Sequence, residues 1–136
     1  MRNAGLVPEG ENRVQYLLIG LGGFFGANAR FLVSSWAARL LGSHFPYGTF
    51  LANITGSLLL GVTIAVLHDR ALLASPQRHF FVVGFLGAYT TFSTFAYESM
   101  QLFQNGSILL GLLNIVGSVM VGLLAVVCGF WLGRLL

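Results

Sequence analysis

Four long stretches without a charged residue constrain what this chain can fold into; they cover residues 14–29, 40–68, 79–97 and 99–133. A helix rises about 1.5 Å per residue, so about 20 apolar residues cross the hydrocarbon core of a bilayer. Three stretches are close to this length or exceed it, and the first reaches it if Arg30 is tolerated in the membrane. The pattern therefore predicts an all-α integral membrane protein with four transmembrane helices.

The composition excludes a soluble domain. Charged residues make up only 8% of the 136 residues, too few to cover a water-exposed exterior. The first stretch does not resemble a cleavable signal peptide, because it is too long and follows the mixed-charge segment MRNAGLVPEGENR. The single cysteine, Cys128, lies deep in the last apolar stretch, so the sequence predicts neither a disulfide within the chain nor a cysteine-based metal cluster.

One domain covering residues 1–136 is expected. Its helices are expected near residues 14–40, 47–68, 78–103 and 107–134. The connecting segments GSHFP, DRALLASPQR and QNGS collect the Gly, Pro, Asn and charged residues that end helices. Because these connections are short, neighbouring helices are expected to run antiparallel.

The arginines are distributed unequally between the two ends of the predicted bundle. One end carries Arg39 alone, and the other carries Arg2, Arg13, Arg70, Arg78 and Arg134. By the positive-inside tendency, this distribution favours both termini in the cytoplasm. Arginines scattered in loops suggest lipid headgroups rather than nucleic acid as their partners.

Each predicted helix carries small or polar residues on one face, at the four-residue spacing of a helix. The series are Gly22, Gly26 and Arg30; Thr49, Asn53 and Ser57; Gly84 and Gly87, with Thr91 and Phe95, in the third helix; and Gly111, Asn114, Ser118 and Gly122. Close helix packing is the favoured explanation for most of them, and for Gly22-x-x-x-Gly26 in particular. For Asn53, a structural role and a pore-lining role are both open, because its amide must be satisfied where water is scarce.

The segment GAYTTFSTF, residues 87–95, interleaves hydroxyl groups with phenyl rings inside an apolar stretch. Adjacent threonines, a serine and a nearby glycine favour side chain-to-backbone hydrogen bonds over an undisturbed helix. A helix broken at membrane depth persists only where it is buried in protein or lines a polar passage. Its free carbonyls can hold a cation, and its free N–H groups can face an anion. We therefore expect the third helix to break here.

The hydroxyl, amide and aromatic side chains of this sequence are suited to binding an anion rather than to catalysing a reaction. His44, His68 and His79 fall at predicted helix ends, and the sequence shows no nucleophile–base set, so an enzyme is not expected. Amide and hydroxyl donors are uncharged, and the edges of aromatic rings carry partial positive charge. Such contacts are individually weak, and a series of weak sites lets an ion leave as well as enter.

Three motifs together resemble the Fluc-type fluoride channels, also called the CrcB family. They are Gly-x-x-x-Gly-Ala-x-x-Arg from Gly22, Gly-Thr-x-x-x-Asn-x-x-Gly-Ser from Gly48, and Gly-x-x-Gly-x-x-Thr-Thr-Phe-Ser-Thr-Phe from Gly84. The resemblance implies two four-helix subunits of opposite orientation that form narrow fluoride pores between them. It also implies passive export of fluoride across the cell (inner) membrane, which relieves fluoride toxicity.

The resemblance also implies roles for individual residues. Phe92 and Phe95 would present ring edges to fluoride, and Asn53 would donate its amide on the same path. Thr94 and Ser118 would line the pore, with Thr49 and Asn114 as less certain candidates. The backbone carbonyls of Gly87 and Thr90 from both subunits would hold a structural sodium ion at the dimer centre.

Two alternatives are open. A subunit that inserts in both orientations should show little arginine bias, so the partner is either a second copy, which we favour, or an oppositely oriented paralogous subunit. The protein could also be a small proton-coupled exporter, which needs a carboxylate within the membrane. Glu98 is the only candidate for that group, although it could equally be an interfacial carboxylate. A packing subunit of a larger assembly is a third possibility, in which Phe92 and Phe95 would be ordinary core residues.

Overall fold

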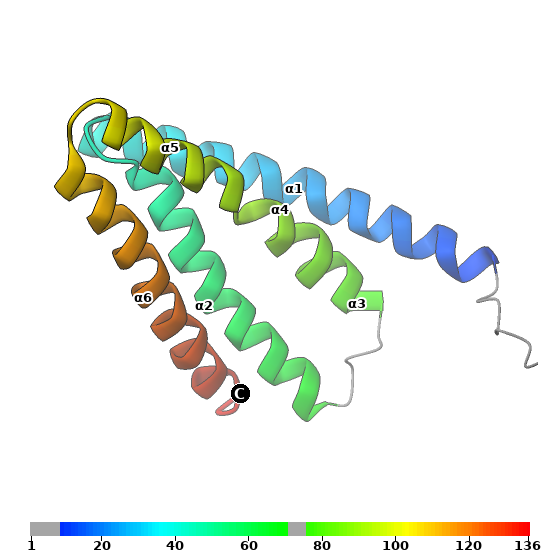
Figure 1. Ribbon diagram of the computed structural model, residues 1–136. Helices are drawn as coiled ribbons and strands as arrows, with labels where there is room; N and C mark the ends of the chain where they lie inside the picture. Colours follow the sequence, from blue (N-terminus) through cyan, green and yellow to red (C-terminus); the bar gives the residue numbers. More distant parts are fainter. Residues whose placement is uncertain (1–8, 71–75) are drawn as a thin grey trace, which may run out of the picture.

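The structure is a computed structural model, and it describes residues 9–70 and 76–136. The helices are α1 (Glu9–Leu41), α2 (Tyr47–Asp69), α3 (Pro76–Arg78), the π-helical η1 (His79–Leu86), α4 (Gly87–Tyr89), α5 (Phe92–Gln104) and α6 (Ile108–Gly133). No strand occurs in these two ranges. The elements from α3 to α5 follow one another along a single path, so they form one interrupted helix (Figure 1).

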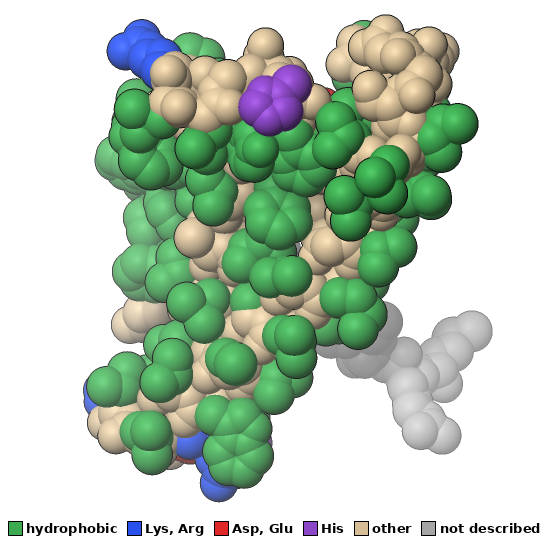
Figure 2. Space-filling view, turned by 90° about the vertical axis from the view of Figure 1, so that its left-hand side faces the viewer, with side chains coloured by type: hydrophobic (Ala, Val, Ile, Leu, Met, Phe, Trp, Pro, Cys, Tyr) green, Lys and Arg blue, Asp and Glu red, His purple; other side chains and the backbone are tan. Residues whose placement is uncertain are grey.

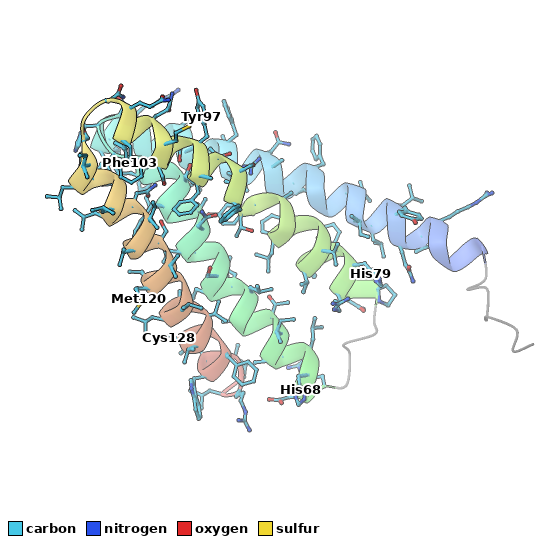
Figure 3. The ribbon with its side chains drawn as sticks, viewed as in Figure 1. His68, His79, Tyr97, Phe103, Met120 and Cys128 are labelled. Carbon is cyan, nitrogen blue, oxygen red and sulfur yellow. The ribbon has the colours of Figure 1, made fainter. Side chains whose placement is uncertain are left out.

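In the described part of the chain, four helical segments are long and apolar enough to cross a membrane. They are Arg13–Leu41, Tyr47–Asp69, Pro76–Gln104 and Ile108–Gly133. Hydrophobic side chains fill the middle of the face in Figure 2, while arginine and histidine side chains lie at its two ends. The prediction of an all-helical, multi-pass membrane protein is therefore confirmed, although α1 begins at Glu9, earlier than expected.

The short connections end the helices where the sequence predicts. Gly42 follows α1 with a φ of 79°, and Gly106 follows α5 with a φ of 76°. Both angles lie in the left-handed region, where glycine ends a helix without the steric penalty of a Cβ atom. The connection between α2 and α3 lies partly outside the described residues.

Glycines bring the helices into close contact in pairs. A Cβ atom on Gly22 or Gly26 of α1 would collide with the backbone of η1, at Phe80 and Phe85. A Cβ atom on Gly129 of α6 would collide in the same way with the backbone of α2. The interpretation of Gly22-x-x-x-Gly26 as a packing face is confirmed. Accordingly, α1 runs beside the interrupted helix, and α2 runs beside α6 (Figure 1).

The helices approach one another at one end of the molecule and diverge toward the other (Figure 1). Arg39 lies at the end where they approach, near the α1–α2 connection. Arg13, Arg70, Arg78 and Arg134 lie toward the opposite ends of their helices, and Arg30 lies within α1. The unequal distribution expected from the sequence therefore holds for the described part of the chain; Arg2 lies outside it.

Candidate functional site

The interrupted helix breaks at two adjacent threonines. Thr90 has a ψ of 156°, and Thr91 has a φ of −151° and a ψ of 126°, so both are extended between α4 and α5. The break predicted within residues 87–95 is confirmed. The π-helical turn before it was not predicted, and such turns are rare and often lie at functional sites.

Asn53 of α2 holds the broken backbone with both ends of its amide. Its Nδ2 donates to the carbonyl of Thr91 at 3.0 Å, and its Oδ1 accepts from the N–H of Thr91 at 2.8 Å. In a continuous helix the N–H of Thr91 would donate to the carbonyl of Gly87. Asn53 takes that donor, so the Gly87 carbonyl is released for another partner.

A cavity of about 410 Å³ lies beside the break, between α2, η1, α4, α5 and α6. It is lined by six of the predicted site residues: Asn53, Gly87, Thr90, Phe92, Phe95 and Ser118. Ser57 and Thr91 add further hydroxyl groups, and the rest of the lining is apolar or glycine. The structure thus brings residues from these five elements and the break into one space that contains neutral donors and aromatic rings.

The two phenyl rings occupy different environments within this cavity. Phe95 is 9% exposed, whereas Phe92 is 79% exposed at the surface of the subunit. Their ring centroids lie 5.8 Å apart, and the rings are tilted by 51°. Because Phe92 projects outward, a neighbouring molecule could complete its surroundings.

Ser118 faces the same cavity from α6. Its Oγ is buried and has no hydrogen-bond partner among the described residues. A buried hydroxyl left without a partner costs about 1–3 kcal/mol. Ser118 therefore places a hydroxyl group without a described protein partner beside the cavity.

A second cavity of about 550 Å³ lies near the α1–α2 connection, and its lining includes Thr49, Glu98, Gln101 and Asn105. Thr49 is buried and its Oγ1 donates to Glu98 Oε1 at 2.9 Å. Thr49 lies one helical turn before Asn53 on α2, so the two cavities follow each other along this helix. The half-buried Glu98 lies on α5, beyond Phe95.

Asn114 and Thr94 line neither of these cavities. Asn114 is 1% exposed, and its Nδ2 donates to Ser99 Oγ at 2.9 Å, which in turn donates to the Phe95 carbonyl at 2.8 Å. These two hydrogen bonds join α6 to the backbone of α5 at Phe95. Thr94 is exposed in the first turn of α5, where its backbone N–H donates to the Thr91 hydroxyl.

The sequence reasoning missed three residues that hold these elements in place. Ser99 joins Asn114 to Phe95, and Thr55 and Tyr89 bond to each other across α2 and α4 at 2.8 Å. The four-residue spacing between Phe95 and Ser99 was available in the sequence. The pairing of Thr55 with Tyr89 was not, because it depends on how α4 lies against α2.

A cation at the break would depend on backbone oxygen atoms. Within the described residues, no group of three His, Cys, Asp or Glu side chains could hold a metal ion. Gly87 is exposed, and the last carbonyls of a helix that ends lack helical partners. These donors are neutral oxygen atoms, which suit a hard cation of low charge.

Within the described residues, four helices long and apolar enough to span a membrane and a helix break beside a cavity define the class: a small helical integral membrane protein. Residues 17–130 match the family described as "CrcB-like protein, Camphor Resistance (CrcB)". The chain belongs to the CrcB family, as the three sequence motifs predicted.

Curated relatives cover most of the chain. A protein from Clostridium perfringens (strain ATCC 13124) is 47% identical over 88% of this chain and 94% of its own length. A protein from Chloroflexus aurantiacus (strain J-10-fl) is 45% identical over 87% of this chain and 94% of its own. A third, from Hydrogenovibrio crunogenus, is 41% identical over 89% and 92%. All three are named "Fluoride-specific ion channel FluC".

Proposed function

We propose that this protein is a fluoride channel rather than an enzyme, and that it exports fluoride passively across the cell (inner) membrane. The observation that carries the proposal is the convergence of Asn53, Phe92, Phe95 and Ser118 on one cavity beside the helix break. The names of the relatives support fluoride as the ion. Export of fluoride that entered as the neutral acid would relieve its toxicity.

The lining suits an anion that must lose water without being trapped. Moving a small ion into a medium of low dielectric constant costs on the order of 20 kcal/mol, so compensating contacts must be dense. The spare N–H of Asn53, the free hydroxyl of Ser118 and the ring edges of Phe92 and Phe95 all present partial positive charge. None carries a full charge, so each contact is weak enough for the ion to move on.

The second cavity supports a route from the break toward one end of the bundle. Asn53 and Thr49 are one turn apart on α2, and Phe95 and Glu98 are close in sequence on α5. An ion that leaves the first cavity along these helices meets the hydroxyl of Thr49 next. Thr94 and Asn114, which line neither cavity, act on this route through the positions of α5 and α6.

The proposal includes a partner of opposite orientation. Phe92 is 79% exposed and Gly87 lies at the surface of the subunit, so the break faces outward. A two-fold axis in the membrane plane would bring the break of one subunit against that of another. The carbonyls of Gly87 and Thr90 from both subunits would then surround one sodium ion at the dimer centre.

A proton-coupled exporter is the second candidate, because Glu98 is half-buried beside the second cavity. Such an exporter needs the carboxylate to exchange protons, so Glu98→Gln should abolish its transport. A channel should keep most of its fluoride conduction in the same variant. The two functions therefore differ in the response to a single isosteric substitution.

Fluoride efflux from liposomes that contain the purified protein tests the proposal. A fluoride electrode should record rapid loss of internal fluoride once a potassium ionophore removes the charge imbalance, and chloride-loaded liposomes should retain their anion. The channel proposal fails if fluoride is retained. A strict requirement for a proton gradient would support the exporter instead.

A further inference from the structure

The helix break is attached to α2 on both of its sides. After the break, Asn53 binds the backbone of Thr91. Before it, the phenol oxygen of Tyr89 lies 2.8 Å from Thr55 Oγ1. Tyr89 is only 7% exposed, and it is the last residue of α4.

The direction of the Tyr89–Thr55 hydrogen bond follows from the partners of the threonine. Thr55 Oγ1 lies 2.7 Å from the carbonyl of Leu51, one turn earlier on α2. A threonine hydroxyl has one hydrogen, and the carbonyl can only accept. Thr55 therefore donates to Leu51, and Tyr89 donates to Thr55.

The ring of Tyr89 is held on two sides. A Cβ atom on Gly56 would lie 3.1 Å from Cδ1 of Tyr89 and would collide with the methyl group of Thr90. The ring of Phe85 is stacked with that of Tyr89, with centroids 5.9 Å apart and planes 9° apart. Because Gly56 has no side chain, Tyr89 and Thr90 pack directly on α2.

We propose that Tyr89 and Thr55 are positioning residues, whose hydrogen bond sets the backbone geometry of residues 87–91. Neither residue lines the cavity beside the break, so neither is placed to touch a permeating ion. Each acts through Gly87 and Thr90, whose carbonyls the proposed function assigns to the central cation. The expected effect on cation binding therefore rests on the proposed function, whereas the positioning of residues 87–91 by the Tyr89–Thr55 hydrogen bond does not.

If the proposal is right, the most sensitive measurement is how fluoride efflux depends on the sodium concentration. Interhelical hydrogen bonds in membrane proteins are modest, so Tyr89→Phe should raise the sodium concentration for half-maximal fluoride efflux by about threefold to tenfold. Thr55→Val should do the same, because it removes the acceptor and keeps the shape. The double variant should resemble either single variant, since both remove one interaction.

The test measures fluoride efflux from proteoliposomes across a series of sodium concentrations, with N-methylglucamine as the replacement cation. Tyr97→Phe is the matched control. Tyr97 is on the same interrupted helix, but it is exposed, and within the described ranges its hydroxyl has one partner, the Gln101 side chain, from which it accepts. The proposal is overturned if Tyr89→Phe matches Tyr97→Phe, or if the effects of Tyr89→Phe and Thr55→Val add in the double variant.

Hydrogen exchange of the backbone amides of residues 87–91 gives a second measurement that needs neither fluoride flux nor sodium. Exchange should be faster in Tyr89→Phe and Thr55→Val than in the wild type and the Tyr97→Phe control. If liposomes that contain the wild-type protein retain fluoride, the proposed function is refuted. The comparison of hydrogen-exchange rates still tests the role of the Tyr89–Thr55 hydrogen bond. Equal exchange in all four proteins would refute the role of the Tyr89–Thr55 hydrogen bond.

Discussion

The side-chain amide of Asn53 pairs with the backbone of Thr91 as a neighbouring strand would, accepting its N–H at 2.8 Å and donating to its carbonyl at 3.0 Å. One side chain thereby supplies the partner that the broken helix cannot give to the N–H of Thr91, and it shares the carbonyl of Thr91 with the first turn of α5. The amide has two N–H groups, and among the described residues only one of them is engaged. A structural role and a pore-lining role are therefore compatible in the same residue.

Asn53→Ala should lower fluoride efflux by at least tenfold and destabilise the protein. The substitution leaves the backbone N–H of Thr91 without a partner, at about 1–3 kcal/mol for an unsatisfied group. Efflux from liposomes and thermal unfolding in detergent measure the two effects. Asn28→Ala is the control, because Asn28 is exposed and, among the described residues, its side chain bonds only to the carbonyl of Phe24 on its own helix. Wild-type efflux in Asn53→Ala would contradict this role.

Phe95→Ile should reduce fluoride efflux strongly while the protein still folds. Isoleucine retains most of the apolar volume beside the cavity but has no ring edge with partial positive charge. Phe31→Ile on α1 is a matched control, since Phe31 is 70% exposed and lines neither cavity. If Phe95→Ile conducts like the control, the rings are ordinary packing residues, as expected of a packing subunit in a larger assembly.

Much of the fold follows from simple features of the sequence. Charge-free stretches set the number of spans, and Gly42 and Gly106 mark helix ends because each adopts a positive φ. The break was predictable because Thr90 and Thr91 are adjacent hydroxyl residues that compete for backbone hydrogen bonds. The π-helical turn of η1 was not predictable, because its apolar sequence is equally compatible with an ordinary α-helix.

The site was predictable in part for a geometric reason. Residues on one continuous helix, such as Thr49 and Asn53, share a face that spacing alone reveals. Beyond the extended Thr90 and Thr91, the rotation of α5 relative to η1 is not fixed by spacing. Phe92 and Phe95 line the cavity, whereas Thr94 does not. The pore roles of these residues stay predictions.

Gly26→Ala should destabilise the protein by about 1–3 kcal/mol, a typical cost of overpacking a close contact. The added methyl group would collide with the backbone of Phe85 in η1, which cannot rotate aside as a side chain can. Gly23→Ala is the control on the same helix, because no atom lies within 4 Å of its added methyl group. Thermal unfolding in detergent should show a lower midpoint for Gly26→Ala only. Equal midpoints would contradict the close packing of α1 on η1.

Expression of this chain alone should yield an active, antiparallel homodimer, with its C-terminus found on both sides of the membrane. The arginines oppose this outcome, because Arg13, Arg70, Arg78 and Arg134 lie at one end and Arg39 at the other. Labelling of a cysteine added after Leu136, in intact and in opened cells, measures the two orientations; Cys128→Ser removes the background thiol. Arg39→Ala should shift the distribution further toward cytoplasmic termini. If every C-terminus is cytoplasmic and the purified protein is inactive, the partner is an oppositely oriented paralogous subunit, whose positive charges must lie at the other end.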